Sequence, residues 1–502
     1  MTFETAVSLG GYFVLMLAIG LYAWRKSTSN VSEFMLGGRQ LSPAVAALSA
    51  GASDMSGWML MGLPGAIYLA GYSAAWIAVG LLAGAWANYL LVAPRLRVYT
   101  EAVGDAVTIP DYLEKRFDDG SRRLRVLASL VIVIFFTLYT SAGLVAGGKL
   151  FEASFGLDYT AGLVLTAAVV LAYTLFGGFL AVSLTDFVQG CIMFAALVLV
   201  PIVTIATLGG WSETQATVGA TSPDYLSWFS GVTALGLVSS LAWGLGYFGQ
   251  PHIIVRFMAV RSVRDMPTTR RIGMSWMLVT VIGSVLCGVA GLAYVTRTGL
   301  PLEDPETIFI ALSQTLFHPY VAGFLLAAIL AAIMSTISSQ LLVSSSSLTE
   351  DFYKTFFRRD ASQRELVLVG RLATLAVALV SMGLAMDRSS SILSLVSNAW
   401  AGFGAAFGPV ILLSLHWRRM TAEAALAGIV VGAATVLIWL YAPFAIGGEA
   451  PSSVLYEMVP GFLASGLVAI GVARFGPEVS RRVEATYQQT IALLRQDRAS
   501  DR

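Results

Sequence analysis

The sequence predicts an all-α integral membrane protein with 13 transmembrane helices. Of its 502 residues, 57% are hydrophobic and only 12% are charged, against roughly 45–50% and 25% in soluble globular proteins. Apolar stretches of about 20 residues, the length that crosses a bilayer core, recur along the whole chain. The 31 Lys and Arg residues fall almost entirely in alternate connections, a distribution that membrane insertion favours.

The predicted spans follow one another with short connections, which leaves no room for a second, soluble domain. They are residues 5–24, 42–63, 66–93, 126–148, 160–182, 187–208, 232–254, 272–296, 319–349, 367–386, 391–417, 421–441 and 453–473. The first span is not predicted to be a cleaved signal peptide, because its positive residues, Arg25 and Lys26, follow the apolar stretch.

Charge placement supports this set of spans and orients it. With the N-terminus outside and the chain alternating across the membrane, 28 of the 31 Lys and Arg residues lie on the cytoplasmic side. Lys149, Arg297 and Arg388 remain outside. The C-terminus is therefore predicted to be cytoplasmic. Residues 1–475 are expected to form a single transmembrane domain, and residues 476–502 a polar, solvated cytoplasmic tail.

Composition also excludes several classes of protein. A net charge of +1 and the lack of a long basic run argue against nucleic-acid binding. Cys191 and Cys287 lie in apolar runs and predict neither a disulfide framework nor a metal cluster. The three histidines, His252, His318 and His416, stand at span ends, and no two of them approach a shared helix face. We therefore expect no catalytic residues and no enzymatic activity.

One carboxyl group, Asp54, lies deep inside a predicted span, within Ala-Gly-Ala-Ser-Asp-Met-Ser-Gly-Trp at residues 50–58. An ionisable side chain in hydrocarbon is costly and points to function. Gly51 and Gly57 weaken helical structure on either side of it. An unwound helix there would free carbonyls to coordinate a cation near the membrane midplane. The alternative is a protonated Asp54 that bonds a neighbouring helix.

The seventh span has a second interruption, Trp-Gly-Leu-Gly-Tyr-Phe-Gly-Gln-Pro at residues 243–251. Three glycines followed by a proline disfavour a continuous helix. With the first span set aside, the second and seventh spans each open a block of five. Five is odd, so the sequence predicts two inverted repeats, spans 2–6 and 7–11, with spans 1, 12 and 13 peripheral. Paired broken helices point to a transporter's substrate site, and a chance match of two glycine-rich packing helices is the alternative.

Hydroxyl groups gather in the ninth span, where Ser335 and Thr336 are adjacent. The side chains of neighbouring residues in a helix point about 100° apart. The two hydroxyls can therefore bind one ion only where another helix crosses. Hydroxyl and carbonyl oxygens suit Na⁺, while the scarcity of carboxylates argues against Ca²⁺ or Mg²⁺. The alternative is that both hydroxyls bond carbonyls one turn back in their own helix.

Two further features have two interpretations each. Asp186, at the cytoplasmic end of the sixth span, is either a helix N-cap or a group on an ion exit path. Tyr139, Trp243 and Tyr247 lie in or near the broken and central segments. They either pack the bundle or wall a small-molecule pocket.

The residues around these interruptions resemble the sodium:solute symporter family, and in particular its bacterial Na⁺/proline symporters. The resemblance is carried by Leu-Gly-Gly-Arg at 36–39, the segment 47–58, the segment 243–252 and Leu-Ala-Ala-Ile-Met-Ser-Thr at 330–336. It extends over about residues 10–475. It implies a LeuT-like core of two inverted five-helix repeats, a location in the cytoplasmic (inner) membrane and function as a monomer.

The resemblance also implies roles for individual residues. The Na⁺ site is expected at the carbonyls of Ala52, Met55 and Ala332 and the hydroxyls of Ser335 and Thr336. Asp54 is implied in high Na⁺ affinity, Asp186 in coupling or ion release, and Arg39 in coupling. The residues implied in proline binding are Ser56, Gly57, Tyr139, Trp243, Tyr247 and Pro251.

Together, the residues and the resemblance predict a secondary transporter in the lipid bilayer that moves Na⁺ and L-proline inward together by alternating access. A Na⁺-coupled symporter for another small solute, such as pantothenate, is the alternative within this class. A membrane sensor, which needs a signalling module after residue 475, and a channel, which needs a continuous polar pore, are less favoured.

Overall fold

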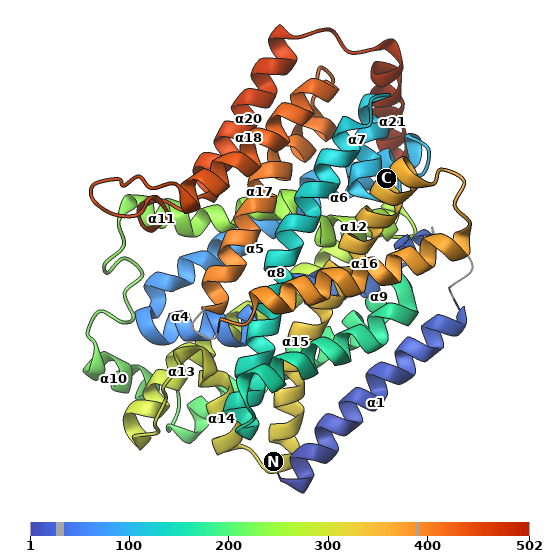
Figure 1. Cartoon of the computed structure of the whole chain (residues 1–502). Coiled ribbons are helices and arrows are strands. Elements are labelled where there is room, and N and C mark those ends of the chain that lie inside the picture. Colours follow the sequence, from blue (N-terminus) through green and yellow to red (C-terminus); the bar gives the residue numbers. More distant parts are fainter. Residues whose placement is uncertain (1, 27–34, 388–390, 501–502) are drawn as a thin grey trace.

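The computed structural model describes residues 2–26, 35–387 and 391–500; Arg388 lies outside them. Within these ranges the regular structure is helical apart from two isolated β-bridges. The helices form one elongated bundle (Figure 1). The N-terminus and α14 (Ile308–Leu316) lie at one end, and α6 (Ala93–Ala102), α7 (Ile109–Phe117) and α21 (Arg481–Ser500) lie at the other. The charge distribution had predicted that these two groups lie on opposite sides of the membrane.

Ten helical stretches of the described chain are long and apolar enough to cross a membrane, so the protein is a multi-pass membrane protein. Their principal helices are α1 (Phe3–Lys26), α5 (Trp76–Leu91), α8 (Arg123–Phe155), the second part of α9 (Tyr159–Thr207), α13 (Met266–Thr298), α15 (Pro319–Ser346), α16 (Gln363–Leu384), α17 (Ile392–His416), α18 (Ala422–Tyr441) and α20 (Met458–Phe475).

The other three predicted spans are those in which the backbone is interrupted. Span 42–63 contains α3 (Pro43–Met55), after which the helix breaks. Span 160–182 holds the apolar helix Tyr159–Ala172 and a turn at Gly178, where φ is 59°. Span 232–254 divides into α11 (Ala234–Ala242), the 3₁₀ segment η4 (Trp243–Gly249) and α12 (Pro251–Ala259). None of the three is a continuous crossing helix, because a turn or a glycine-rich segment divides it.

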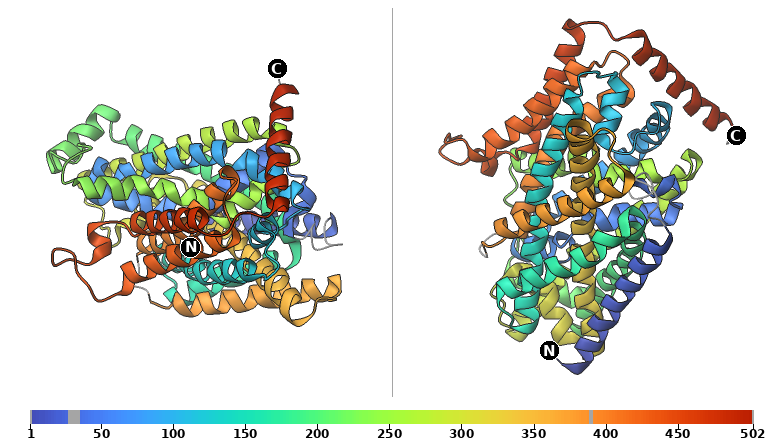
Figure 2. Two further views of the ribbon diagram at one scale, coloured as in Figure 1. Left: turned by 90° about the horizontal axis from the view of Figure 1, so that it is seen from above. Right: turned by 45° about the vertical axis from the view of Figure 1, so that its right-hand side comes forward.

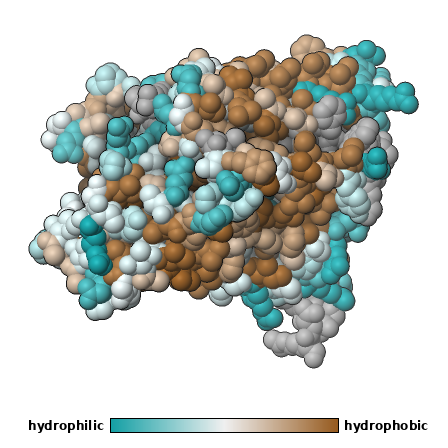
Figure 3. Space-filling view, turned by 90° about the horizontal axis from the view of Figure 1, so that it is seen from below, coloured by the Kyte–Doolittle hydropathy of each residue, from teal (hydrophilic) through white to brown (hydrophobic). Residues whose placement is uncertain are grey.

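Burial separates a core from a periphery. Helix α15 is the most buried of the ten stretches, followed by α17 and α8, whereas α1 and α20 are the least buried. Peripheral helices expose large apolar side chains, such as Val14, Leu379 and Leu467. Figure 3 shows broad hydrophobic areas on one face of the molecule. Areas of that size are uncommon on soluble proteins, and in a bilayer they contact acyl chains.

The two ends of the chain attach differently to the bundle. Helix α1 lies along its edge and packs on α9 and α15 (Figure 2). Helix α21 was expected to be solvated, yet one of its faces docks on the end of the bundle. Tyr487 Oη donates to His416 O at 2.9 Å, and Arg482 Nη1 lies 2.9 Å from Asp118 Oδ1. Val483, on the docked face of this helix, is buried. The partners are distant in sequence, so the polar composition of the tail alone did not reveal the contact.

Candidate ion and substrate site

Helix α3 ends within the segment predicted to be interrupted. Ser42 caps its N-terminus by accepting a hydrogen bond from Val45 N, and Pro43 occupies the first turn. The helix stops at Met55 because the next residue, Ser56, has a φ of 43°. Residues other than glycine rarely adopt this backbone conformation. A π-helical turn and α4 (Leu63–Ala70) follow. The break leaves the last carbonyls of α3 without partners along the helix.

The glycines beside Asp54 permit close packing. Gly51 lies inside α3, and a Cβ atom there would stand 2.7 Å from the ring of Trp276. A Cβ atom at Gly57 would stand 2.9 Å from the Cβ of Ala146. Gly51 thus lies within a continuous helix, where its small size is needed for contact with α13, and Gly57 directly follows the break at Ser56.

Four of the five predicted Na⁺ ligands meet where α3 crosses α15. Ser335 Oγ donates to Ala52 O at 2.8 Å and to Ala332 O at 3.1 Å. Thr336 Oγ1 donates to the same two carbonyls at 3.4 and 3.2 Å. These four residues are almost fully buried. Both the bonds within α15 and the bonds to the crossing helix are thus present, and they gather four oxygens of the type that Na⁺ binds. The fifth predicted ligand, Met55, ends α3.

Asp54 connects α3 to the second interrupted segment. Its Oδ2 accepts a hydrogen bond from Tyr247 Oη at 2.5 Å, and both side chains are buried. Its backbone carbonyl, one of those freed by the break, faces Tyr139 Oη at 3.4 Å. A bond to another segment belongs to the alternative interpretation, a protonated Asp54, but here Tyr247 is the donor and the bond does not require a proton on Asp54. Asp54 therefore contacts two residues predicted to bind proline, Tyr247 through its carboxylate and Tyr139 through its backbone carbonyl.

The second interruption, η4, is shaped by close packing at its glycines. A Cβ atom at Gly246 would stand 1.9 Å from Trp400 Nε1, and one at Gly244 would stand 2.2 Å from Gly80 O. Trp400 Nε1 also donates to Trp243 O at 2.8 Å. Pro251 then begins α12, where its fixed φ suits the first turn. The glycines let α5 and α17 approach this segment, and the proline restarts the helix.

Aromatic rings surround the place where the break after α3 meets η4. Only some of them were predicted from the sequence. Trp243 stacks on Tyr456 with ring centroids 5.4 Å apart and lies 6.3 Å from Trp58. Tyr247 meets Trp400 edge to face at 5.1 Å. Trp58, Trp400 and Tyr456 had not been predicted. Trp58 follows the first break closely and could have been found from that position, whereas Trp400 lies in α17 and Tyr456 in the connection before α20, where the sequence has no unusual pattern.

The space beside Asp54 is small in this structure. Asp54 and Tyr247 line a cavity of about 20 Å³ that is completed by residues of α3, α5, α12 and α13. A cavity of roughly 10–15 Å³ holds one water molecule, so this one is too small for an amino acid. Occupation by a substrate requires the segments around the junction to move apart.

Asp186 belongs to a buried ion pair. The chain turns at Gly178, and α9 continues through Asp186, so the interpretation of Asp186 as an N-cap is wrong. Its Oδ2 lies 3.2 Å from Arg256 Nη2, and both side chains are fully buried. From its place in the sequence, Arg256 was expected in a cytoplasmic connection. Its apolar neighbours, 253–255 and 257–260, were a signal that this charge lies within the bundle.

Arg39 fastens the connection that precedes α3. Its Nη1 donates to Met258 O and its Nη2 to Ala106 O, both at 2.8 Å. Burial, together with the positive charge of Arg97, lowers the pKa of Arg39 from its ordinary value. Arg39 thus ties the start of α3 to α12 and to the segment after α6, at the end of the bundle predicted to be cytoplasmic.

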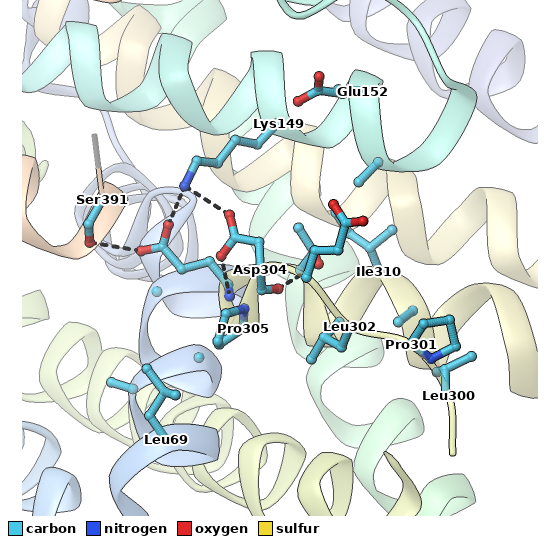
Figure 4. Close-up of a pocket in the computed structure, with 18 of the residues that line it drawn as sticks. Leu69, Lys149, Glu152, Leu300, Pro301, Leu302, Asp304, Pro305, Ile310 and Ser391 are labelled. Carbon is cyan, nitrogen blue, oxygen red and sulfur yellow. Dashed lines mark hydrogen bonds and ion pairs between the residues drawn. The ribbon is translucent and has the colours of Figure 1, made fainter. Parts of the chain in front are cut away.

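A larger cavity, of about 970 Å³, lies at the opposite end (Figure 4). On one side of it Lys149 Nζ lies 3.0 Å from Asp304 Oδ2 and 2.8 Å from Glu306 Oε2. Glu306 also accepts a hydrogen bond from Ser391 Oγ at 3.1 Å and from two backbone amides at the start of α17. The segment that carries Asp304 and Glu306 is therefore held against α8 and the start of α17. Asp54 and Tyr247 do not line this cavity.

Residues 34–432 match the sodium:solute symporter family. The chain is 57% identical to the osmoregulated proline transporter OpuE of Bacillus subtilis strain 168, over 97% of each chain. It is 60% identical to the high-affinity proline transporter PutP of the same organism, over 95% of this chain and 100% of the relative. It is 51% identical to the sodium/proline symporter of Staphylococcus aureus strain JH9, over 98% of this chain and 97% of the relative.

Among solved structures, the fold is similar to that of a Na⁺-coupled sialic acid symporter in a substrate-bound, outward-open state. The TM-score is 0.80 at 21% identity, over 96% of this chain and 99% of that one. Mhp1, a nucleobase-cation-symport-1 family transporter, matches with a TM-score of 0.57 at 13% identity, over 92% and 100%. The TM-scores show a similarity of fold alone.

A multi-pass bundle with two interrupted helices, one beside a cluster of oxygens and the other beside aromatic rings, defines a membrane transporter. The sequence relationships extend over nearly the whole chain and agree with that class. The chain belongs to the sodium:solute symporter family. It is accordingly a transporter and not an enzyme.

Proposed function

We propose that this protein is a Na⁺/L-proline symporter that works by alternating access. The observation that carries the proposal is the convergence of Ser335 and Thr336 on the Ala52 carbonyl, beside the bond between Asp54 and Tyr247. The oxygens suited to Na⁺ binding are thereby close in sequence to Asp54, which is hydrogen-bonded to the aromatic segment η4. Three relatives at 51–60% identity are named for proline transport, which favours L-proline over pantothenate.

The proposed architecture has 13 spans in the cytoplasmic membrane, with the N-terminus outside and the C-terminus inside. Spans 2–6 and 7–11 form two inverted repeats of a LeuT-like core, with spans 1, 12 and 13 peripheral. Residues 1–475 make up the transport domain, residues 476–502 the cytoplasmic tail, and the monomer is the functional unit. The interruptions after α3 and at η4 open the two repeats and support this division.

In this mechanism Na⁺ enters from outside and binds the carbonyls of Ala52, Met55 and Ala332 and the hydroxyls of Ser335 and Thr336. The ion replaces the hydrogen bonds that now join these oxygens. The ion fixes the position of the end of α3, which includes Asp54. The hydrogen bond from Tyr247 to Asp54 then holds the side chain of Tyr247 in place. Ion and substrate then bind with a reciprocal coupling of about 1–3 kcal/mol.

The substrate is proposed to bind between the two interruptions. Trp243, Tyr247 and Tyr139 pack against the pyrrolidine ring, while Ser56 and Gly57 contribute polar backbone. The N-terminus of α12, which begins at Pro251, favours a carboxylate through its helix dipole. Rocking of the repeats then opens the site inward, driven by the Na⁺ gradient and by about 2.3 kcal/mol per charge per 100 mV of membrane potential. Asp186 assists ion release, and Arg39 supports coupling.

The test is uptake of radiolabelled L-proline into proteoliposomes with an inward Na⁺ gradient. We expect concentrative uptake that is lost when K⁺ replaces Na⁺. Na⁺-dependent uptake of pantothenate but not of proline would reject the proposed substrate and leave the ion site intact. Uptake that does not depend on Na⁺ would reject the mechanism.

Removal of one hydroxyl ligand tests the ion site. Ser335→Ala is expected to raise the Na⁺ concentration for half-maximal uptake by about tenfold or more, since losing a polar ligand to a charge costs about 1.5–3 kcal/mol. Ser338→Ala is the matched control, because Ser338 is equally buried on α15 but donates within its own helix, to Ser335 O. Equal shifts in the two variants would contradict a specific role for Ser335.

A further inference from the structure

One face of α21 packs against the end of the bundle that is predicted to be cytoplasmic. Val483, Tyr487 and Thr490 are spaced by four and three residues, so they lie on one face of this helix. Val483 and Thr490 are buried, and the helix contacts α6 and α7. Tyr487 Oη also donates to the carbonyl of His416, the last residue of α17, at 2.9 Å. Helix α21 therefore touches α17 and the connection that contains α6 and α7 at the same time.

This position bridges the two proposed repeats. Helices α6 and α7 connect spans 3 and 4 of the first repeat, and α17 is span 11 of the second. The two repeats also touch directly here, because Arg95 Nη1 donates to Leu415 O at 2.9 Å and Arg116 Nε donates to Ser414 O at 3.0 Å. Rocking of the repeats must change these contacts, and Tyr487 of α21 contacts residues on both sides of them.

The guanidinium of Arg116 is buried where Tyr487 meets the bundle. Its Cζ lies 5.0 Å from the ring centroid of Tyr99, 4.9 Å from that of Phe117 and 5.6 Å from that of Tyr487. Such cation–π contacts are favourable, but Nη1 and Nη2 are buried and have no hydrogen-bond partner among the described residues. A buried charged donor without an acceptor is costly. Because the Tyr487 ring belongs to α21, its departure would let water reach these two nitrogens.

The ion pairs that α21 makes are exposed to solvent. Arg482 lies 2.9 Å from Asp118, and their side chains are 80% and 42% exposed. Arg418 lies 3.7 Å from Glu484, and their side chains are 62% and 46% exposed. Exposed ion pairs contribute little to stability. Docking of α21 thus rests on a narrow face that includes Tyr487 and is opposed by the burial of Arg116 Nη1 and Nη2, a balance that makes the contact reversible.

We propose that α21 is an autoinhibitory helix of the transporter. When docked, it holds α6 and α7 against the end of α17 and slows the opening of the site to the cytoplasm. When detached, it lets the two repeats move apart more readily and speeds the release of Na⁺ and substrate. The inference rests on the proposed alternating-access symport, whereas the docked position of α21 is a feature of the fold.

Tyr487→Ala tests the proposal, with Gln489→Ala as the matched control at an exposed position of the same helix. Spin labels at Gln488 and Arg419, both exposed, report docking through the distance between them in a variant without the two native cysteines. Tyr487→Ala is expected to lengthen and broaden this distance and to raise the maximal rate of proline uptake per transporter severalfold, while Gln489→Ala changes neither. A docked helix in Tyr487→Ala, or detachment without a faster rate, would overturn the proposal.

The converse experiment locks the helix in its docked position. In the variant Arg482→Cys/Asp118→Cys, the two cysteines replace residues that pair in the docked state, and a cleavable bifunctional reagent crosslinks them. The crosslink is expected to slow proline uptake below the parent rate, and a reducing agent that cleaves it should restore the rate. The parent, treated in the same way, should not respond. A rate that the crosslink leaves unchanged would contradict inhibition by α21.

Cysteine accessibility separates this inference from the proposed function. Ser346 is buried and lines, with Pro251 and Val255 of α12, a cavity of about 20 Å³, which inward opening would widen. Ser346→Cys should therefore react faster with a water-soluble maleimide when combined with Tyr487→Ala than in the parent background. If the parent takes up no proline in the presence of Na⁺, the symport proposal fails, yet this difference is still expected. Equal reaction rates would reject the inhibitory role of α21 whatever the substrate.

Discussion

Asp54→Asn is expected to raise the Na⁺ concentration for half-maximal proline uptake by roughly 30-fold. The substitution retains an oxygen that can accept the hydrogen bond of Tyr247 but removes the negative charge two residues from the Ala52 carbonyl. Unit charges roughly 8 Å apart interact by about 2 kcal/mol at an effective dielectric constant of about 20. The effect should be read from uptake at saturating proline over a range of Na⁺ concentrations.

Tyr247→Phe is the control that separates charge from hydrogen bonding. It removes the hydroxyl that bonds Asp54 and leaves the carboxylate in place. We expect it to weaken proline binding more than Na⁺ binding, because it leaves the Asp54 charge in place but removes the hydrogen bond that orients the Tyr247 ring beside Trp400. Near-normal Na⁺ affinity in Asp54→Asn, or an equal loss of Na⁺ affinity in Tyr247→Phe, would reject a role for the Asp54 charge.

Gly246→Ala should sharply reduce the amount of folded protein. The added methyl group would stand 1.9 Å from Trp400 Nε1 and 2.4 Å from its Cε2. Trp400 is fully buried and is held by its bond to Trp243 O, so its ring cannot move aside freely. Overpacking of this kind costs about 3 kcal/mol. Yield of monodisperse protein and its thermal unfolding midpoint in detergent are the measurements.

Gly383→Ala is the matched control for packing at a helical glycine. Gly383 lies in α16, and a Cβ atom there has no neighbour within 4 Å. Its substitution is expected to leave the unfolding midpoint unchanged or slightly raised, because alanine favours a helix. An unchanged midpoint in Gly246→Ala as well would show that η4 has more room than the contact with Trp400 implies.

The sequence alone predicted a multi-pass membrane protein and two of the places where its helices are interrupted. Hydropathy and charge are sums over neighbouring residues, so they predict spans and orientation without knowledge of the fold. The residues 243–251, with three glycines and a proline, likewise predicted a break from local backbone preferences. A single ionisable residue in an apolar segment marked Asp54 for the same reason.

Only the tertiary structure decided which of these groups meet. Ser335 reaches the Ala52 carbonyl across 283 residues of sequence, and Tyr247 reaches Asp54 across 193. Arg256 had been assigned to a cytoplasmic connection, yet it is fully buried against Asp186. Span prediction averages over a window, and it therefore counts a charge near a span end as exposed. Whether that charge is exposed or paired depends on helices that cross there, and packing of distant segments alone determines those crossings.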